Sequence, residues 1–139
     1  MTPRVELPAH LAARLRAEAR AAAPRECCGL VEGVRAGDLV RVTALHPARN
    51  LDAAADRFRI DPRDQFAAQR TARANGRAIV GCYHSHPGGA ARPSAADLAG
   101  AGEEDFLWLI AADAALGAFI YRQGGFAAAE LAGQGPAPL

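Results

Sequence analysis

The sequence predicts an α+β domain (α/β in the broad sense) built on a mixed, mostly antiparallel sheet. Several short runs are continuously apolar or alternate in polarity, as strands do. Only two substantial segments have a helical pattern, so runs of strands are interrupted by helices rather than alternating with them. A length of 139 residues suits one domain. We place that domain at residues 1–132 and expect residues 133–139 to form a flexible C-terminal tail.

The N-terminal part predicts a helix followed by a hairpin. The helix runs from Pro8 to about Ala22, with one apolar face formed by Leu7, Leu11, Leu15 and Ala19. Pro24 ends it. The apolar run from Cys27 to Gly33 is the next strand, and a Gly-containing turn leads to another at residues 39–45.

The rest of the chain predicts a second helix and more strands. Residues 57–60 alternate charged and large apolar side chains, which indicates a one-sided strand. Asp61 and Pro62 are helix-start signals and Asn75-Gly76 is a stop signal, so a helix spans roughly residues 62–75. The remaining elements are a buried strand, a short helix and three strands, at residues 78–85, 94–102, 106–111, 117–121 and 126–131.

Composition excludes several function classes. The formal net charge of +1 argues against a nucleic-acid partner, which calls for a concentrated basic surface. No run of 18 apolar residues predicts a membrane span, and the N-terminal segment lacks the apolar core of a signal peptide. We therefore expect a cytoplasmic protein whose three cysteines, Cys27, Cys28 and Cys82, are thiols.

The stretch from Gly81 to Asp97 carries the chemistry. His84 and His86 stand two apart at the end of the buried strand, so both imidazoles project from one face. A Gly- and Pro-containing loop can return Asp97 to the same place, giving three N/O ligands and one open position, as in a catalytic zinc site. Ser94-x-x-Asp97 is also nearly a helix capping box, and the two interpretations are compatible.

A hydrolytic zinc site also needs a base that takes a proton from water. Physical reasoning alone leaves this residue open, because many acids are candidates: Glu26, Glu32, Asp52, Asp56, Asp61 and the acidic cluster at residues 103–105. Cys27 and Cys28 suggest a nucleophilic alternative, but adjacent cysteines in an apolar strand are usually buried and inert. Tyr83 and Ser85 are expected to face away from the metal, and His10 and His46 to lie at the surface.

The chain resembles the JAMM metalloproteases of the MPN-domain, or JAB, family. Their pattern is an early Glu, then His-Ser/Thr-His-Pro, six residues, Ser, two residues and Asp. Here Glu26 is followed by His84-Ser85-His86-Pro87, six residues, Ser94 and Asp97. The segment from Pro24 to Leu30 is similar to that of small bacterial members, and the likeness covers roughly residues 7–131. One departure is Ala111-Ala112-Asp113, where many relatives have a Ser in the pocket wall.

The resemblance implies a single domain with a curved sheet flanked by helices. It also implies that His84, His86 and Asp97 bind one zinc ion per chain. Glu26 is then the general base and later the acid, and Ser94 helps to hold the tetrahedral oxyanion. The implied reaction is hydrolysis of the amide bond after the Gly-Gly tail of a ubiquitin-like or sulfur-carrier protein.

A carrier-tail peptidase is favoured over a polyubiquitin-specific enzyme, because this short chain carries no appended recognition domain. The alternative is a non-catalytic MPN scaffold or interaction module, although inactive members typically lack the metal ligands that this chain has. The carrier protein and the oligomeric state stay open.

Overall fold

Eight strands and three helices follow one another along residues 2–132, which the computed structural model of the chain describes. In chain order they are β1 (Arg4–Glu6), α1 (Ala9–Ala22), β2 (Cys28–Ala36), β3 (Leu39–Ala48), α2 (Pro62–Ala74), β4 (Ala78–Ser85), α3 (Ala95–Gly100), β5 (Leu107–Ala112), β6 (Ala115–Arg122), β7 (Gly125–Ala128) and β8 (Glu130–Ala132). The tail predicted at residues 133–139 lies outside the described residues. None of the helices within residues 2–132 is long and apolar enough to cross a membrane.

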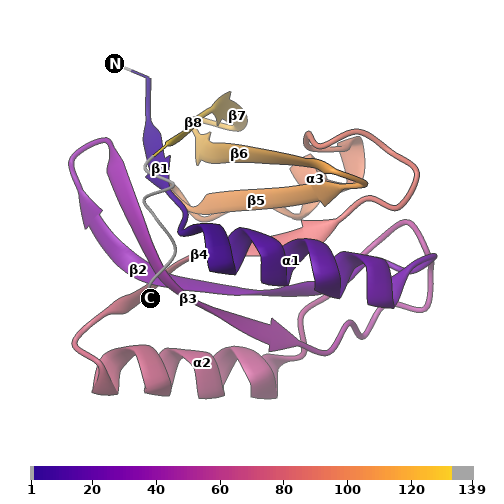
Figure 1. Cartoon of the computed structure of the whole chain (residues 1–139), viewed down its shortest axis with the longest axis horizontal. Helices are drawn as coiled ribbons and strands as arrows, with labels where there is room; N and C mark the ends of the chain where they lie inside the picture. Colours follow the sequence, from indigo (N-terminus) through magenta and orange to yellow (C-terminus); the bar gives the residue numbers. More distant parts are fainter. Residues whose placement is uncertain (1, 133–139) are drawn as a thin grey trace.

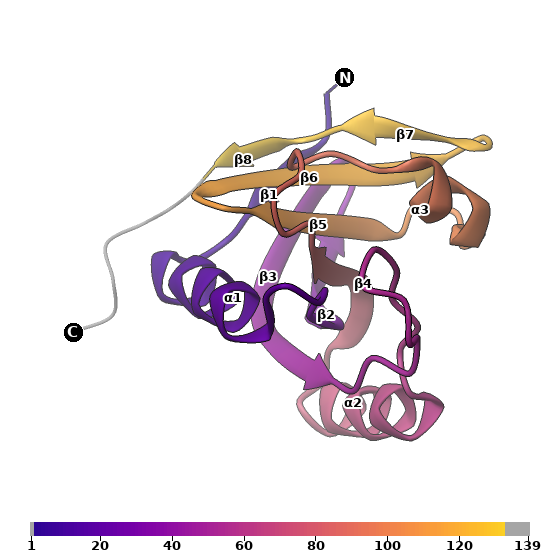
Figure 2. The ribbon, with the colours of Figure 1, turned by 90° about the vertical axis from the view of Figure 1, so that its right-hand side faces the viewer.

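All eight strands belong to one mixed sheet in the order β7-β6-β5-β4-β2-β3-β1-β8. Three neighbouring pairs are parallel, namely β4–β5, β1–β3 and β1–β8, and the other four are antiparallel. The sheet curves around α1, while α2 packs beside β2, β3 and β4 (Figures 1 and 2). The predicted α+β class and mixed sheet are therefore confirmed.

The main core lies between α1 and one face of the sheet. Leu11 and Leu15 of α1 are buried together with Val31 of β2 and Tyr83 of β4. The Tyr83 hydroxyl donates to the Glu18 carboxylate, with O···O distances of 2.9 and 3.0 Å, and this bond ties β4 to α1. Because side chains alternate along a strand, the residues on either side of Tyr83 point to the opposite face of the sheet.

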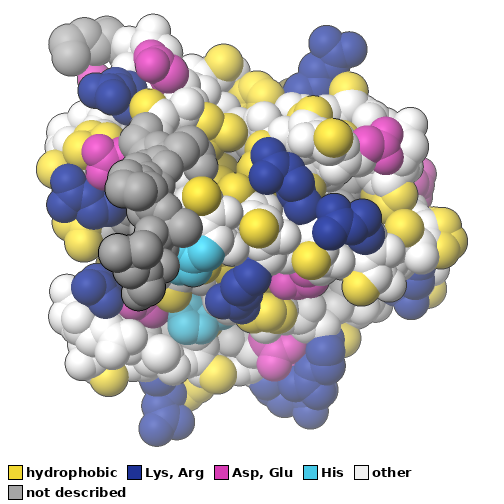
Figure 3. Space-filling model, viewed as in Figure 1, with side chains coloured by type: hydrophobic (Ala, Val, Ile, Leu, Met, Phe, Trp, Pro, Cys, Tyr) yellow, Lys and Arg dark blue, Asp and Glu magenta, His cyan; other side chains and the backbone are white. Residues whose placement is uncertain are grey.

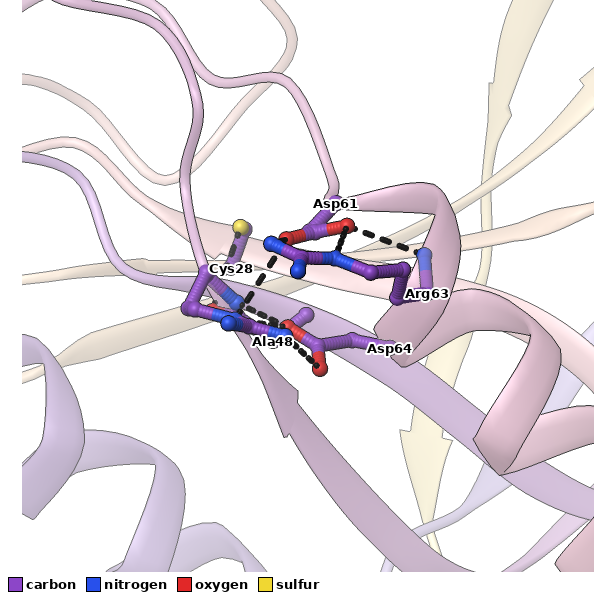
Figure 4. A network of polar contacts seen from close by, with 6 residues as sticks. Cys28, Ala48, Asp61, Arg63 and Asp64 are labelled. Atoms are coloured by element: carbon purple, nitrogen blue, oxygen red, sulfur yellow. Dashed lines mark hydrogen bonds and ion pairs between the residues drawn. The ribbon is translucent and has the colours of Figure 1, made fainter.

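The helix predicted at residues 62–75 is confirmed, and its start is held by local polar contacts. The Asp61 side chain caps α2 by accepting a 2.9 Å hydrogen bond from Arg63 N, and Pro62 occupies the first turn. Asp64 accepts bonds from the Arg49 backbone and guanidinium. Figure 4 shows these contacts beside Cys28, at the start of β2.

Two strand predictions are wrong. Residues 57–59 form a loop, and only Ile60 makes an isolated bridge, to Asn50. The Asn50 side chain binds backbone groups of this loop, which satisfies them without a strand partner. The strand expected at residues 126–131 is instead two strands, because β7 pairs with β6 whereas β8 turns to pair with β1.

The surface has mixed charge. On the face drawn in Figure 3, the described arginines are interspersed with acidic and apolar side chains. No single-sign field is expected from such a distribution, which agrees with the nearly neutral composition.

Candidate metal centre and catalytic site

The two histidines come together where β4 ends, on the face of the sheet opposite α1. His84 is fully buried and the His86 side chain is 11 % exposed. Their Nε2 atoms lie 2.9 Å apart. The common direction predicted from strand alternation is therefore confirmed.

Asp97 of α3 completes a three-residue cluster. Its Oδ2 atom lies 3.0 Å from His84 Nε2 and 3.1 Å from His86 Nε2, and the residue is buried. Zinc bonds to nitrogen and oxygen of about 2.0–2.2 Å in a tetrahedron imply ligand atoms about 3.3 Å apart. Two imidazole nitrogens and one carboxylate oxygen at this spacing fit a zinc ion after a small expansion.

Each imidazole is oriented by a different contact. The Nδ1 atom of His86 lies 2.9 Å from the Ala90 carbonyl, to which it can donate, so the ring turns its other nitrogen, Nε2, to the cluster. His84 Nδ1 is buried without a hydrogen-bond partner among residues 2–132. Phe58 stacks on the His84 ring at 4.4 Å and 22°, and Trp108 meets it edge-on at 5.7 Å.

Glu26 lies two residues before the start of β2, with its carboxyl group beside the histidines. The residue is buried, and its Oε1 atom has no hydrogen-bond partner within residues 2–132. One ligand atom each from Glu26, His84 and His86 lies within 4.8 Å of the others, so this trio could also hold a metal ion. Asp97 meets both histidines more closely, with its Oδ2 within 3.1 Å of each Nε2, so it is better placed than Glu26 to act as the third ligand.

The protonation states suit these roles. Burial raises the pKa of Glu26 to about 7; the His86 charge opposes the rise, and Asp97, Asp56 and Asp52 add to it. Burial also opposes ionisation of Asp97, but hydrogen bonds with both histidines outweigh it and hold the pKa of Asp97 well below its usual range. Burial lowers the pKa of His84, whereas the hydrogen bond to Asp97 raises that of His86. At neutral pH the cluster therefore has an ionised carboxylate and a neutral His84, the forms that bind metal.

Ser94 caps α3 and holds Asp97 at the same time. Ser94 Oγ accepts a 3.1 Å bond from Asp97 N, and Ser94 N donates a 2.9 Å bond to Asp97 Oδ2. The capping box that the sequence suggested is therefore present. A hydroxyl that accepts one bond can still donate its proton, so an oxyanion contact stays a prediction.

Two cavities adjoin the cluster. One is a cleft of about 630 Å³, whose walls include Pro24, Glu26, His86, Pro87, Pro93 and Ser94. The other, of about 470 Å³, lies beside Asp97; its walls combine apolar side chains such as Leu30, Phe58 and Trp108 with the charged residues Arg57, Arg59 and Glu103. Both fall in the size range of small-ligand sites.

Three of the other candidate bases, Glu32, Asp61 and Asp105, have structural partners elsewhere, whereas Asp56 lines the same cleft as Glu26. Glu32 is fully buried, and its carboxylate contacts His46 at 2.9 Å and Asn75 at 3.3 Å. His46 is thus a partner of a buried acid, and its prediction as a plain surface residue is wrong. Asp61 caps α2, and Asp105 pairs with Arg122.

The cysteines, and the two strand residues predicted to face away from the metal, behave as expected. Cys27, Cys28 and Cys82 are buried and free. Burial raises the pKa of Cys27 to about 11 and that of Cys28 to about 12, so both are thiols rather than nucleophilic thiolates. Tyr83 and Ser85 are buried on the α1 side of the sheet, away from the cluster.

Two neighbours of the cluster were missed by reasoning from sequence. Phe58 was placed in a strand, yet it lies in a loop and covers His84. Asn50 makes four hydrogen bonds with its side chain, one of them to the Glu26 carbonyl. A lone Asn in a long polar loop gives no signal of such contacts before the loop is folded.

A family model described as prokaryotic homologues of the JAB domain matches residues 8–122. The chain belongs to this family. The match covers the whole cluster, from Glu26 to Asp97, and confirms the resemblance drawn from those residues.

Curated relatives of this JAB domain have different names. Over 89 residues, or 63 % of the chain, it is 36 % identical to the desampylase of Haloferax volcanii. Over 84 residues, or 60 % of the chain, it is 37 % identical to the tail tip assembly protein K of Escherichia phage N15. The matched parts span only 62 % and 30 % of those two proteins.

Two solved structures are similar over nearly the whole JAB domain. A protein of Desulfitobacterium hafniense has a TM-score of 0.84 at 34 % identity, covering 92 % of this chain and 91 % of its own. A protein of Salinibacter ruber has a TM-score of 0.71 at 32 % identity, covering 98 % of this chain and 95 % of its own. The similarity extends well beyond the site to the fold as a whole.

Proposed function

We propose that this JAB domain is a zinc-dependent metallopeptidase that hydrolyses the amide bond after the Gly-Gly tail of a ubiquitin-like or sulfur-carrier protein. The observation that carries the proposal is the meeting of His84 Nε2, His86 Nε2 and Asp97 Oδ2 within 2.9–3.1 Å. Beside them lies the buried Glu26 carboxyl, whose Oε1 has no hydrogen-bond partner within residues 2–132. The sequence similarity to a desampylase supports deconjugation as the type of reaction.

Each residue has a role in the proposed reaction. His84, His86 and Asp97 hold zinc, which when bound supplies a Lewis acid for the scissile carbonyl and lowers the pKa of water. Glu26 takes the proton of the attacking water and returns it to the leaving amine. Its pKa of about 7 suits both transfers near neutral pH. Ser94, at the edge of the same cleft, donates to the developing oxyanion.

A glycine tail suits the cleft that contains Glu26 and Ser94. Pro24, Pro87 and Pro93 make its walls rigid, and a glycine segment, having no side chains, can bring its backbone close to them. A ubiquitin-like substrate is therefore the partner we propose, in the cytoplasm.

A second candidate function is a non-catalytic scaffold. The similarity to a protein named for tail tip assembly favours it, since that name denotes a part in building a structure. Against it, a scaffold has no need of a buried carboxyl whose Oε1 has no partner among residues 2–132, next to two histidines.

Metal analysis and a cleavage assay test the proposal together. Purified protein is expected to contain about one zinc ion per chain. It should cleave a ubiquitin-like carrier extended beyond Gly-Gly, and a chelator should abolish cleavage until zinc is restored. Full cleavage by metal-free protein would rule out the mechanism. Zinc binding without cleavage of any extended carrier would favour the scaffold.

A further inference from the structure

The peptide unit between Glu26 and Cys27 is held at both ends by side chains. The Asn50 amide donates to the Glu26 carbonyl with an N···O distance of 3.1 Å. The Cys27 N–H donates to Ser85 Oγ at 2.8 Å. We propose that Asn50 and Ser85 are positioning residues for the Glu26 carboxylate. This inference rests on the proposed function, in which Glu26 is the base.

The backbone contacts matter because the Glu26 side chain has few of its own. Glu26 Oε1 is buried without a hydrogen-bond partner within residues 2–132. The position of the carboxyl group is then determined by the backbone from which it extends. A rigid peptide unit limits that group to few positions. A general base needs this restriction, because it must stay within reach of the proton that it takes.

Ser85 connects the base directly to the metal-binding strand. It stands between His84 and His86, and strand alternation turns it to the opposite face, where it is 1 % exposed. Besides accepting from Cys27 N, Ser85 donates its own N–H to the Cys27 carbonyl at 3.2 Å. The separation between base and histidines is thus set by two hydrogen bonds between neighbouring strand ends.

Asn50 connects the base to the loop that covers His84. Its Oδ1 accepts from Asp52 N and Arg59 N at 2.9 Å each, and its Nδ2 also donates to the Arg57 carbonyl at 3.1 Å. With the bond to Glu26, all four hydrogen bonds available to an amide side chain are made.

The Asn50 contacts with Arg57 and Arg59 lie on either side of Phe58, whose ring stacks on His84. In both ribbon views the loop between β3 and α2 lies beside the end of β4 (Figures 1 and 2). The Asn50 side chain therefore holds both the backbone of Glu26 and the loop that places Phe58 against His84.

The Asn50→Asp substitution tests this role with little change of shape. Aspartate keeps the two acceptor bonds and loses the two donor bonds, so the Glu26 and Arg57 carbonyls lose their partner. We expect kcat to fall roughly 10- to 100-fold, with KM and zinc affinity unchanged. Asn75→Asp is the matched control, because Asn75 donates to the buried Glu32 in another part of the fold. It should lose stability and keep kcat.

Ser85→Ala tests the other end of the peptide unit without adding charge. It should lower kcat in the same way, and Ser85→Thr, which retains a hydroxyl, should recover part of the rate. Thr43→Val is the matched control, since the Thr43 hydroxyl donates to the Glu32 carbonyl. The two Ser85 variants, Ser85→Ala and Ser85→Thr, also keep the test decisive if Asn50→Asp does not fold.

The fluorescence of the only tryptophan gives a readout that is independent of activity and metal. Trp108 is 6 % exposed, and its ring centroid lies 5.9 Å from that of Phe58. In zinc-free protein, Asn50→Asp should free Phe58 and shift Trp108 emission to longer wavelength, whereas Asn75→Asp should not.

The outcomes separate this inference from the proposed function. An active wild-type protein whose Asn50→Asp and Ser85→Ala variants keep full kcat overturns the positioning role alone. An emission shift with full kcat likewise overturns it, since Asn50 would then anchor only the loop. An inactive wild-type protein overturns the proposed function, and with it the base to be positioned.

Discussion

Ser94 and Asp97 bind each other in both directions at the start of α3. Ser94 Oγ accepts from Asp97 N at 3.1 Å, and Asp97 Oδ2 accepts from Ser94 N at 2.9 Å. The same Oδ2 atom meets both histidines of the cluster. The helix cap therefore also aims the carboxylate, although α3 contains only six residues.

Replacing Ser94 with Ala should separate these two contributions. Loss of an N-cap hydroxyl costs about 1 kcal/mol of the free energy of unfolding. Loss of an oxyanion donor lowers kcat by a further factor of about 100. Urea unfolding of the zinc-free protein measures the first effect, and steady-state cleavage measures the second. Ser94→Thr, which keeps both functions, is the control. Reduced stability with an unchanged kcat would limit Ser94 to capping.

Local sequence patterns were sufficient for much of the site. Alternation along one strand predicted that His84 and His86 point the same way, and Asp61-Pro62 predicted the start of α2. Both patterns act over a few residues, so the rest of the fold does not alter them. Asp97 could be proposed as a ligand because a flexible loop of suitable length precedes it.

Contacts between distant segments could not be predicted in this way. Glu26 was one of several acids until the resemblance selected it, since its approach to His86 depends on how β2 and β4 pair. Alternating residues around Phe58 indicated a strand, but the Asn50 side chain satisfies that backbone instead. The pairing of β8 with β1 likewise depends on the closure of the whole sheet.

Replacing Glu26 with Gln should leave zinc bound and abolish turnover. The amide keeps the size of the side chain but cannot take a proton from water, so we expect kcat to fall by a factor of about 100 to 10,000. Elemental analysis measures zinc, and the carrier assay measures turnover. Asp97→Asn is the contrasting variant, which should lose zinc as well. Loss of metal from the Glu26→Gln variant instead would make Glu26 a ligand, as the alternative trio with the histidines allows.

The same Glu26→Gln substitution should change how stability depends on pH. The pKa of Glu26 is raised to about 7 in the fold. Its contribution to the free energy of unfolding is therefore fully present below the unfolded pKa near 4.5 and is lost as pH rises through about 7. A shift of this size corresponds to roughly 3 kcal/mol for a fully buried group, and solvent screening reduces it to about 1–2 kcal/mol. In urea unfolding with chelator, the free energy of unfolding of the variant should therefore increase relative to that of the wild type between pH 5 and about 8. Parallel pH curves would contradict the raised pKa.

Asp61→Ala should destabilise the fold without affecting metal binding. Asp61 caps α2 through Arg63 N and pairs with the Arg63 side chain. Loss of the cap is expected to cost about 1 kcal/mol in thermal or urea unfolding. Asp61→Asn keeps the cap acceptor without the charge, and should recover most of the loss. Equal destabilisation by both variants would assign the effect to charge instead.

Gly117→Ala should weaken zinc binding through the loop between His86 and Asp97. A Cβ atom at Gly117 of β6 would overlap the Ala91 carbonyl oxygen, a backbone atom that cannot rotate away. Ala91 follows Ala90, whose carbonyl holds His86 Nδ1. Moving this loop removes the contact that orients the His86 ring, and such outer contacts are worth about 10- to 100-fold in metal affinity.

Zinc titration of the apoprotein measures this effect directly. Gly125→Ala is the matched control, because Gly125 is also a strand glycine and an added Cβ has nothing within 4 Å. We expect Gly125→Ala to bind zinc like the wild type, whereas Gly117→Ala binds at least about tenfold more weakly. Equal affinity in both variants would mean that the loop can shift without turning His86, and that the Ala90 contact does not determine the ligand geometry.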